Sequence, residues 1–364
     1  MRTNEAIWIE KSNRWQINLQ IDGERRTFTS STPGKKGKAE AERKADKWEE
    51  ERTQNENIRF PKFWEEFLLY TKEHTSTSNH DQLGYIGRIH FNPVIKHKKV
   101  RDITNQDWQK CVDNAYKRGL SKKTCQNIRG AATSFYRYAK KCRVPMIQPE
   151  DIDIPKNAPK KEKSILQPDD IKKLFTVDTV LDCYKREQPA FYIHAWRFLL
   201  VTGLRRGELC GLKNADIENN ILHVKRSVNR FDEVTSGKTE AANRFMVLPQ
   251  QAIKILADQS KMLKEHGVIS PYAFPNQNGN MTRPTLLYDY WRTYCNQHEI
   301  KCTLHEMRHT LISVAKSDVP PELLKQVVGH SKSMDTFGVY GHKVEGELER
   351  VANIFDNIFN TILK

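Results

Sequence analysis

Basic residues in the C-terminal half stand where a phosphate could bind. The first stretch is TGLRRGEL, in which Gly203 is placed to end one helix in the left-handed conformation. Arg205 then stands where the next helix begins, beside free backbone N–H groups and the positive end of a helix dipole. These are conditions for holding a phosphate. Because an arginine at such a turn is more often a surface residue, this motif needs support from others.

The second stretch, TLHEMRH, combines a histidine and an arginine near the start of a helix. Thr303 and, three residues on, Glu306 form a capping-box pattern, which predicts that a helix begins here. His305 and Arg308 then share one face of its first turn, about 5–6 Å apart at Cβ. They would make an anion site with a titratable group beside it. The alternative is a histidine that is only polar surface, and the adjacent His309 is expected to be less involved.

The third stretch, VVGHS, again has a glycine that ends a helix, followed by a polar residue, His330. Tyr340 comes ten residues later, within FGVYGH. A tyrosine in an amphipathic helix is usually a core or rim residue. Tyr340 is therefore interpreted only together with the other motifs.

In this order, TGLR-x-x-EL, H-x-x-R, GHS and Y-x-H resemble the tyrosine recombinase, or phage integrase, family. The spacing also fits, because 100 residues separate Arg205 from His305 and 22 separate Arg308 from His330. Four linked motifs are far more specific than any one alone. Among family members, the chain looks most like integrases of conjugative transposons and temperate phages.

The resemblance implies a role for each of these side chains. Tyr340 would be the nucleophile that attacks a scissile DNA phosphate, leaving a 3′-phosphotyrosyl link and a free 5′-hydroxyl. Arg205 and Arg308 would hold the non-bridging oxygens, His305 would transfer a proton, and His330 would donate a hydrogen bond to the same phosphate. These roles are chemically consistent, because a phenol with a pKa of about 10 needs a cationic field or a base to react at neutral pH.

The resemblance also implies a lysine on a β-hairpin as general acid for the leaving 5′-oxygen. Lys238, in SGKT before an expected strand at 244–248, matches that position. Lys225, on the preceding strand expected at 221–228, is the competitor. Glu208 would orient Arg205 rather than react. With these groups around one phosphate, neither a metal ion nor a nucleotide cofactor is required.

Composition agrees with a polyanionic partner. The 364 residues include 60 Lys and Arg against 45 Asp and Glu, a net charge of +15, which favours nucleic acid or an anionic membrane face. Apolar runs are too short for a membrane span, and the N-terminus lacks a signal-peptide core. Seven scattered cysteines without metal-ligand spacing fit a reducing compartment. These features make integral membrane and secreted proteins unfavoured classes, and we expect a cytoplasmic protein bound to DNA.

The positive charge is concentrated in one region. Residues 96–163 hold 18 Lys and Arg against 7 Asp and Glu. The alternatives are a solvated helical face or a strap over a phosphate backbone, and the adjoining proline- and lysine-rich segment favours the strap. The expected DNA-binding residues are Lys122, Lys123, Arg129, Lys160 and Lys161.

The elements that position these residues predict a multidomain, mainly α chain. Period-two alternation and a DG turn predict a small N-terminal three-stranded β-sheet plus a helix. A basic loop is expected at 33–37, and the helix from 38 to about 54. Helical spacing predicts four helices next, and then a mixed, mainly α catalytic domain with a small β-sheet. The expected parts are an arm-type DNA-binding domain (1–56), a core-binding helical domain (57–150), a basic linker (151–164), a catalytic domain (165–343) and a C-terminal tail helix (344–364).

The resemblance implies partners as well. These are double-stranded DNA with core-type and arm-type sites, a homo-tetramer on DNA, and an excisionase or DNA-bending protein. The tail helix has an apolar stripe at heptad spacing, which suits either its own domain or a neighbouring protomer. Alternative functions are a type IB topoisomerase or telomere resolvase with the same chemistry, and a non-catalytic DNA-binding regulator on the same scaffold.

Overall fold

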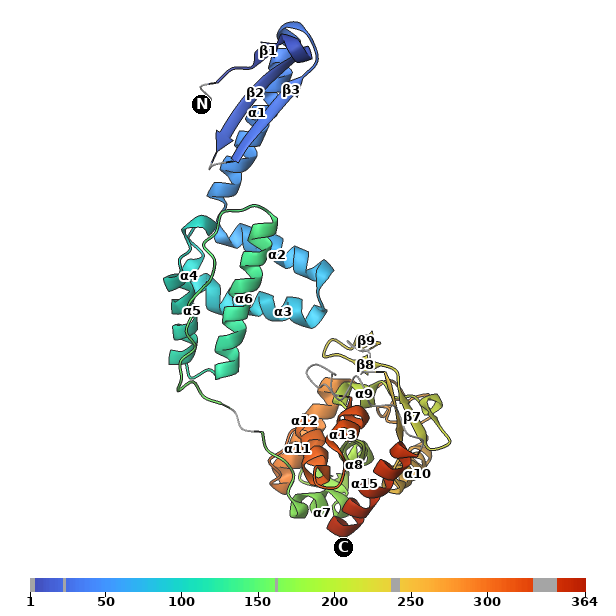
Figure 1. Ribbon diagram of the computed structural model, residues 1–364. Coiled ribbons are helices and arrows are strands. Elements are labelled where there is room, and N and C mark those ends of the chain that lie inside the picture. The colour runs from blue at the N-terminus through green and yellow to red at the C-terminus, as the bar shows by residue number, and fades with distance from the viewer. Residues whose placement is uncertain (1–3, 22–23, 161–162, 237–242, 330–345) are drawn as a thin grey trace. The chain divides into compact units, whose positions relative to one another are not determined.

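The structure, a computed structural model, describes residues 4–21, 24–160, 163–236, 243–329 and 346–364 (Figure 1). Four residues of the expected site, Lys161, Lys238, His330 and Tyr340, lie outside these ranges. The chain divides into two compact units, Met1–Lys161 and Glu162–Lys364. In the described residues, no helix is both long enough and apolar enough to cross a membrane.

The first unit begins with the predicted three-stranded sheet. Strands β1 (Ile7–Ile9), β2 (Arg14–Ile21) and β3 (Glu24–Ser30) pair antiparallel in that order, and α1 (Gly34–Asn57) packs on one face. Alternate residues of β2 point into a small core with alanines of α1. The helix begins at Gly34, earlier than the basic loop at 33–37 suggests. At Gly37 a Cβ would lie 1.7 Å from the Thr32 carbonyl oxygen, so this close first turn requires glycine.

The rest of the first unit is a helical bundle around a core of aromatic rings. Its main helices are α2 (Phe60–His74), α3 (Thr77–Ile86), α5 (Asn105–Lys117) and α6 (Lys122–Lys141). A π-helical turn (Gly87–Phe91) and the short α4 (Asn92–Ile95) follow α3. Thr104 caps α5 and Ser121 caps α6 through their side-chain oxygens. The bundle therefore has the four expected helices, with one extra short helix.

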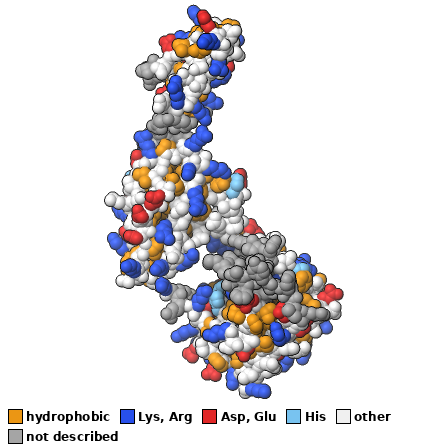
Figure 2. Space-filling view, viewed as in Figure 1, with side chains coloured by type: hydrophobic (Ala, Val, Ile, Leu, Met, Phe, Trp, Pro, Cys, Tyr) orange, Lys and Arg blue, Asp and Glu red, His pale blue; other side chains and the backbone are white. Residues whose placement is uncertain are grey.

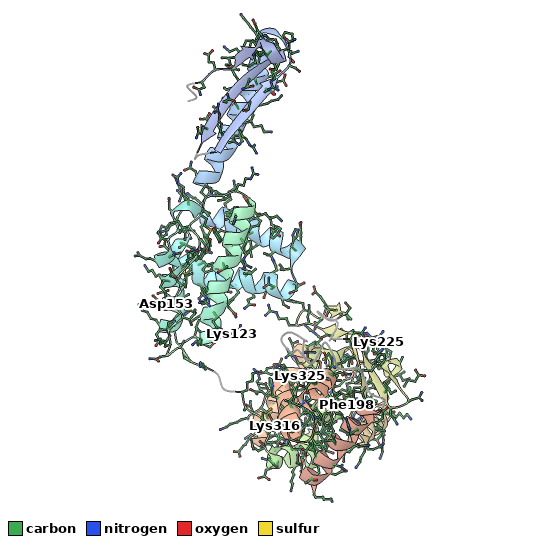
Figure 3. All side chains as sticks on the ribbon, viewed as in Figure 1. Lys123, Asp153, Phe198, Lys225, Lys316 and Lys325 are labelled. Atoms are coloured by element: carbon green, nitrogen blue, oxygen red, sulfur yellow. The ribbon has the colours of Figure 1, made fainter. Side chains whose placement is uncertain are left out.

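The segment after α6 stays on this unit. Asp153, labelled in Figure 3, exchanges two hydrogen bonds with Gln109 of α5, at 2.8 Å and 3.1 Å. Ile152 is buried in the aromatic core. Lys122 N–H donates to the Pro159 carbonyl at 2.8 Å. The early part of the predicted linker is thus packed along α5 and returns to the start of α6.

The second unit is built around one buried helix, α8 (Ile193–Thr202), whose residues are nearly all buried. Helix α10 (Gln250–Glu265) and helix α12 (Leu304–Ala315) pack on it. A helix that is apolar all round belongs in the centre of a core. The remaining helices are α7 (Pro168–Thr176), α9 (Arg206–Cys210), α11 (Pro284–His298), α13 (Pro321–Val328) and α15 (Glu347–Leu363).

The strands of this unit are short. Strands β6 (Ile217–Glu218), β7 (Ile221–Val224) and β10 (Arg244–Val247) form a sheet in the order β10-β7-β6. Two hairpins stand apart from it, β4 (Thr179–Leu181) with β5 (Glu187–Pro189) and β8 (Ser227–Val228) with β9 (Val234–Thr235). The single strand expected at 221–228 is therefore divided between a sheet and a hairpin.

The tail helix α15 packs on its own unit. Val351, Phe355 and Phe359 are buried in the core around α8. Asp356 accepts hydrogen bonds from the N–H groups of Gln250 (2.7 Å) and Gln251 (3.0 Å), so it caps the start of α10. Of the two surfaces that suit its apolar stripe, the helix covers the one on the same chain.

Candidate active site

Arg205 is positioned by a tight turn between two helices. Helix α8 ends at Gly203, which has the left-handed φ of 65° that the sequence predicts. A Cβ there would lie 2.9 Å from the Leu311 side chain, so the close approach of α12 also requires glycine. Arg205 then precedes α9, and its N–H donates to Glu208 Oε2 at 2.8 Å. The turn therefore fixes the backbone of Arg205 at the start of a helix.

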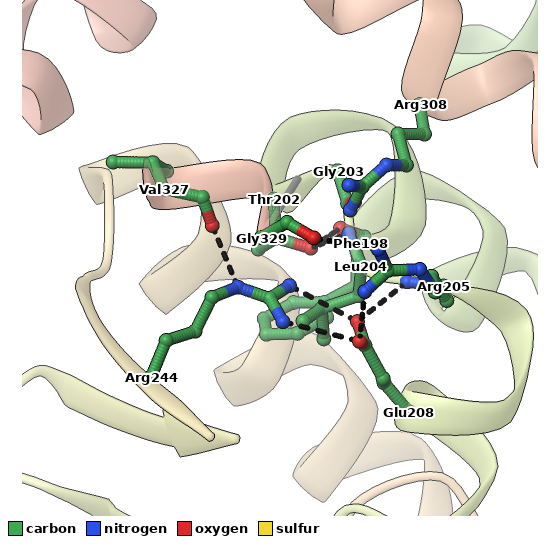
Figure 4. A network of polar contacts seen from close by, with 10 residues as sticks. All are labelled: Phe198, Thr202, Gly203, Leu204, Arg205, Glu208, Arg244, Arg308, Val327 and Gly329. Atoms are coloured by element: carbon green, nitrogen blue, oxygen red, sulfur yellow. Dashed lines mark hydrogen bonds and ion pairs between the residues drawn. The ribbon is translucent and has the colours of Figure 1, made fainter. Parts of the chain in front are cut away.

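The Arg205 side chain is held by two acceptors and remains open to solvent. Its Nη1 lies 2.7 Å from Glu208 Oε1, and its Nη2 donates to the Gly329 carbonyl at 2.6 Å (Figure 4). The side chain is 38% exposed. Gly329 ends α13 and directly precedes His330. The hydrogen bond from Arg205 therefore links the TGLRRGEL stretch to the VVGHS stretch.

Arg308 comes from the helix that the capping box predicts. Thr303 Oγ1 accepts from Glu306 N–H, and Glu306 Oε2 accepts from Thr303 N–H, so α12 begins where expected. Arg308 is 1% exposed, and its Nη1 donates to the Gly203 carbonyl at 2.9 Å. Its Nη2 has no hydrogen-bond partner among the described residues. A buried cation with a free donor is a group that an anion would satisfy.

The charges around Arg308 oppose its protonation. Burial, followed by the nearby Arg205 and Arg244, lowers the pKa of Arg308 to about 9, although Glu208 acts in the other direction. Repulsion among cations that converge without enough anions is typical of a site arranged for a negative ligand.

His305 stands on the first turn of α12 with Arg308, as predicted. Its ring packs edge to face against that of His309, with 5.0 Å between the ring centroids. Partial burial lowers the pKa of His305, and His309, Arg308, Lys163 and Arg205 lower it further. The lowered pKa favours the neutral imidazole of His305, which can accept a proton. Lys163, at the end of the expected linker, belongs to the same basic surroundings.

Glu208 is the centre of the network. It is buried, and burial alone would raise its pKa, but hydrogen bonds from Arg244 and Arg205 outweigh this and lower the pKa. Glu208 is thus ionised and shared between two guanidinium groups. This arrangement fits the supporting role expected for Glu208.

Arg244 is the site residue that sequence reasoning missed. From β10 its Nη1 and Nη2 reach Glu208 Oε1 and Oε2 at 3.1 Å and 3.0 Å, and its Nε donates to the Val327 carbonyl at 2.8 Å (Figure 4). A signal was present in the alternation of β10. Arg244 occupies the same inward register as the buried Met246, and a buried arginine implies an acidic partner.

The competitor lysine is engaged elsewhere. Nζ of Lys225, which is labelled in Figure 3, lies 3.4 Å from Asp216 Oδ1, and the same carboxylate pairs with Arg226. Lys225 therefore pairs with Asp216 and not with Glu208. Lys238, which lies outside the described residues, follows β9 by three positions.

The described DNA-binding candidates gather at the start of α6. Lys122 and Lys123 open this helix, and the Pro159 carbonyl, one residue before Lys160, accepts from the Lys122 N–H. Arg129 is exposed one to two turns on, and its Nη1 reaches the Ile152 carbonyl at 3.4 Å. Lys and Arg side chains are prominent over the helical bundle in Figure 2. The helix and the expected strap thus share one basic surface, which holds Lys122, Lys123 and Lys160.

The described side chains do not suggest a metal centre. Among them, no group of three His, Cys, Asp or Glu residues comes close enough to hold an ion. The polar groups that do converge are mainly cationic, which suits a phosphate rather than a metal.

Known relatives match most of the chain. It is 25% identical over 295 residues to the tyrosine recombinase XerC of Bacillus licheniformis, covering 76% of this chain and 90% of the relative. It is 22% identical over 374 residues to the ICEBs1 integrase of Bacillus subtilis, covering 96% and 98%.

Solved structures share the fold. The Tn1549 transposon integrase in complex with transposon right end DNA superposes with a TM-score of 0.63 at 19% identity, covering 79% of this chain and 96% of that one. The lambda integrase tetramer bound to a Holliday junction gives 0.60 at 13% identity, covering 95% and 99%. At these identities the likeness shows the multidomain, mainly α fold. The model of the phage integrase family matches residues 164–347, half of the chain, and the protein belongs to that family.

Proposed function

We propose that this protein is a site-specific DNA recombinase that cuts and rejoins DNA to integrate and excise a mobile element. One observation carries the proposal. Arg205 and Arg308 come from motifs about a hundred residues apart, yet both are fixed around the turn at Gly203. Arg205 keeps an exposed face and Arg308 a free donor among the described residues.

The two arginines would bind the scissile phosphate. Their guanidinium groups would donate to the non-bridging oxygens and stabilise the charge of the pentacoordinate transition state. Because Glu208 and the Gly203 and Gly329 carbonyls already hold these side chains, little reorganisation is needed during the reaction. The protein would supply in this way the electrostatic stabilisation that metal ions provide in other phosphoryl transfers.

Tyr340 would be the nucleophile. Its oxygen would bond to phosphorus as the bond to the 5′-oxygen breaks, with the phenolic proton passing to neutral His305 and a proton from Lys238 passing to the leaving oxygen. His330 would donate a hydrogen bond to the phosphate. A 5′-hydroxyl from another strand would then attack the phosphotyrosyl bond and restore the tyrosine.

The basic surface of the first unit would hold the DNA. Lys122, Lys123, Arg129, Lys160 and Lys161 would contact the phosphate backbone near the core site. The N-terminal sheet with α1 would bind an arm-type site. The lambda integrase is known as a tetramer on a Holliday junction, and we propose a tetramer on DNA here, with an excisionase or DNA-bending protein to set direction.

Covalent trapping tests the proposal. Fragmented genomic DNA of the host would be incubated with the wild-type protein, Tyr340→Phe and the exposed-site control Tyr184→Phe, then denatured, and the protein-linked ends sequenced. We expect 3′-linked adducts at a few recurring sequences with the wild type and the control, and none with Tyr340→Phe. Adducts with Tyr340→Phe would show that Tyr340 is not the nucleophile. Salt-sensitive binding without any adduct would favour a non-catalytic regulator, and relaxation without strand exchange would favour a topoisomerase.

A further inference from the structure

Arg244 is a buried residue that links three elements of the second unit. Its side chain is 5% exposed. It lies on β10, the first described strand after the segment that contains Lys238. From there it reaches Glu208 on α9 and the Val327 carbonyl on α13. One guanidinium group thus joins the elements next to Arg205, Lys238 and His330.

Arg205 and Arg244 act on the same two acceptor regions. Both share the two oxygens of Glu208, and both donate to carbonyls at the end of α13, Gly329 and Val327. Cations at a helix C-terminus are favourable, because the last carbonyls have no partner within the helix. The two arginines therefore fix the end of α13 from two sides, directly before His330.

Glu208 needs both arginines to hold its orientation. Each of its oxygens accepts from Arg244, one also accepts from the Arg205 side chain, and the other from the Arg205 N–H. Without Arg244, the buried carboxylate would keep only the partially exposed Arg205 as cationic partner. Arg205 would then be drawn toward compensating Glu208 rather than toward a phosphate.

We infer that Arg244 is a positioning residue for strand cleavage, which acts by bracing Glu208 and the end of α13 so that Arg205 is set on the scissile phosphate. This inference rests on the proposed recombinase function. It deepens that function, because it assigns a role in cleavage to a residue outside the four motifs.

A second buried arginine, Arg197, provides a control that distinguishes an effect on the position of Arg205 from a general loss of stability. Counted over the whole residue, Arg197 and Arg244 are each 7% exposed. Arg197 pairs with Asp178, and its Nε donates to the Leu174 carbonyl at 2.9 Å. None of these partners belongs to the Glu208 network. Arg197→Met is therefore the matched control for the loss of a buried, paired guanidinium group.

The test compares two DNA substrates that carry a recurring site found by trapping. One has the natural phosphodiester at the scissile position, and the other a neutral methylphosphonate, which leaves Arg205 less charge to stabilise. We expect Arg244→Met to lower cleavage of the phosphodiester on the order of 100-fold, with DNA affinity unchanged. On the methylphosphonate the loss should shrink to less than about tenfold, since the misplaced charge of Arg205 matters less. Arg244→Lys should recover part of the rate, and Arg197→Met should have equal effects on both substrates.

A second measurement observes Arg205 directly. The Nε–H signal of Arg205 in a ¹⁵N spectrum, assigned with Arg205→Lys, should shift or broaden in Arg244→Met and stay in place in Arg197→Met. Equal losses on both substrates, or an unmoved Arg205 signal, would overturn the inference. Failure of the wild type to form adducts on the phosphodiester would instead remove the proposed function.

Discussion

The helical bundle of the first unit and the core of the second unit bury different kinds of side chain. In the described part of the bundle, the interior is made of stacked and edge-to-face rings, including Phe60, Trp64, Phe91, Trp108 and Phe135. The second unit buries charged side chains inside an equally apolar core, namely Arg197, Glu208, Asp216, Arg244, Glu306, Arg308 and Asp356.

This difference indicates where chemistry takes place. Aromatic packing gives a rigid support, so the bundle can present basic residues on its surface without charges inside. A buried charge is costly unless it is paired. Arg197 and Asp356 are paired within the fold, whereas Glu208, Arg244 and Arg308 converge on one place, which is typical of a functional site. The second unit therefore gives up some stability for the site, whereas the bundle does not.

Arg308→Met should show the largest effect, and it should lower the cleavage rate while raising the melting temperature. Cleavage should fall on the order of 1000-fold, because the phosphate loses a preorganised donor. The melting temperature should rise, since an apolar side chain replaces a buried cation whose Nη2 lacks a partner among the described residues. Lys316→Met, exposed at the end of the same helix, is the control for both measurements. A melting temperature that falls together with cleavage would mean that Arg308 is chiefly structural.

Phe135→Ala should disturb the bundle and leave the second unit intact. Phe135 is fully buried, and its ring lies within 5.1–5.6 Å of those of Phe60, Phe63, Trp64 and Phe67. We expect a loss of about 3–5 kcal/mol in the free energy of unfolding of the bundle.

Hydrogen–deuterium exchange resolves the two units. Exchange should increase in α2, α5 and α6 with Phe135→Ala and stay unchanged in α8 and α12. Gln126→Ala, exposed on α6, should leave both unchanged. Equal destabilisation of α8 would show that the two cores unfold as one.

Asp356→Ala should have a smaller effect, confined to the second unit. The substitution removes both acceptors for the Gln250 and Gln251 N–H groups at the start of α10. The loss of a helix cap costs about 0.5–2 kcal/mol, and thermal denaturation should detect it. The exposed neighbour Asn357→Ala should leave the melting temperature unchanged. An unchanged melting temperature in Asp356→Ala would argue against docking of α15 on its own chain.

Lys163→Gln should cause the smallest change, a rise in the pKa of His305. Lys163 disfavours the charged imidazolium, so its removal favours protonation. In the wild type, the acid limb of kcat/KM should lie below about pH 6.5, the ordinary histidine value. It should move upward in Lys163→Gln, together with the His305 signal in an NMR titration.

His90 in the bundle is the internal reference for that titration. Its pKa is lowered by burial and by Arg118, and should not respond to Lys163→Gln. Because the folded state binds this proton less readily than the unfolded chain, His90 lowers stability as the pH falls through about 6.5. A parallel shift of His90 and His305 would indicate a general change rather than a local charge effect.

Short sequence patterns correctly predicted the helix starts and ends that position the site. The capping pattern at Thr303 and the helix-ending Gly203 correctly placed Arg205 and Arg308 at the starts of helices, because caps depend on a few neighbouring residues. The convergence of the two arginines came from the resemblance to a family. The sequence periodicity itself carries no information on which helix ends meet.

What the sequence did not predict depends on contacts between distant segments. The expected strand 221–228 is broken because Lys225 and Arg226, directly after β7, both pair with Asp216. Arg244 was missed because its partner lies 36 residues earlier on another element. The apolar stripe of α15 suits packing on its own domain or on a neighbouring protomer, so its periodicity does not predict which of the two it covers.

The shared carboxylate also constrains how the protein can evolve. Glu208 serves two guanidinium groups at once, so changing Glu208 alone leaves both groups without their shared carboxylate. Changing Arg244 alone leaves the buried carboxylate with only the partially exposed Arg205 as cationic partner. Among descendants of this chain, the two positions should change together or not at all, whereas residues that contact DNA bases can drift as the target sequence changes. The pair would then record common ancestry after the DNA specificity of the lineages has diverged.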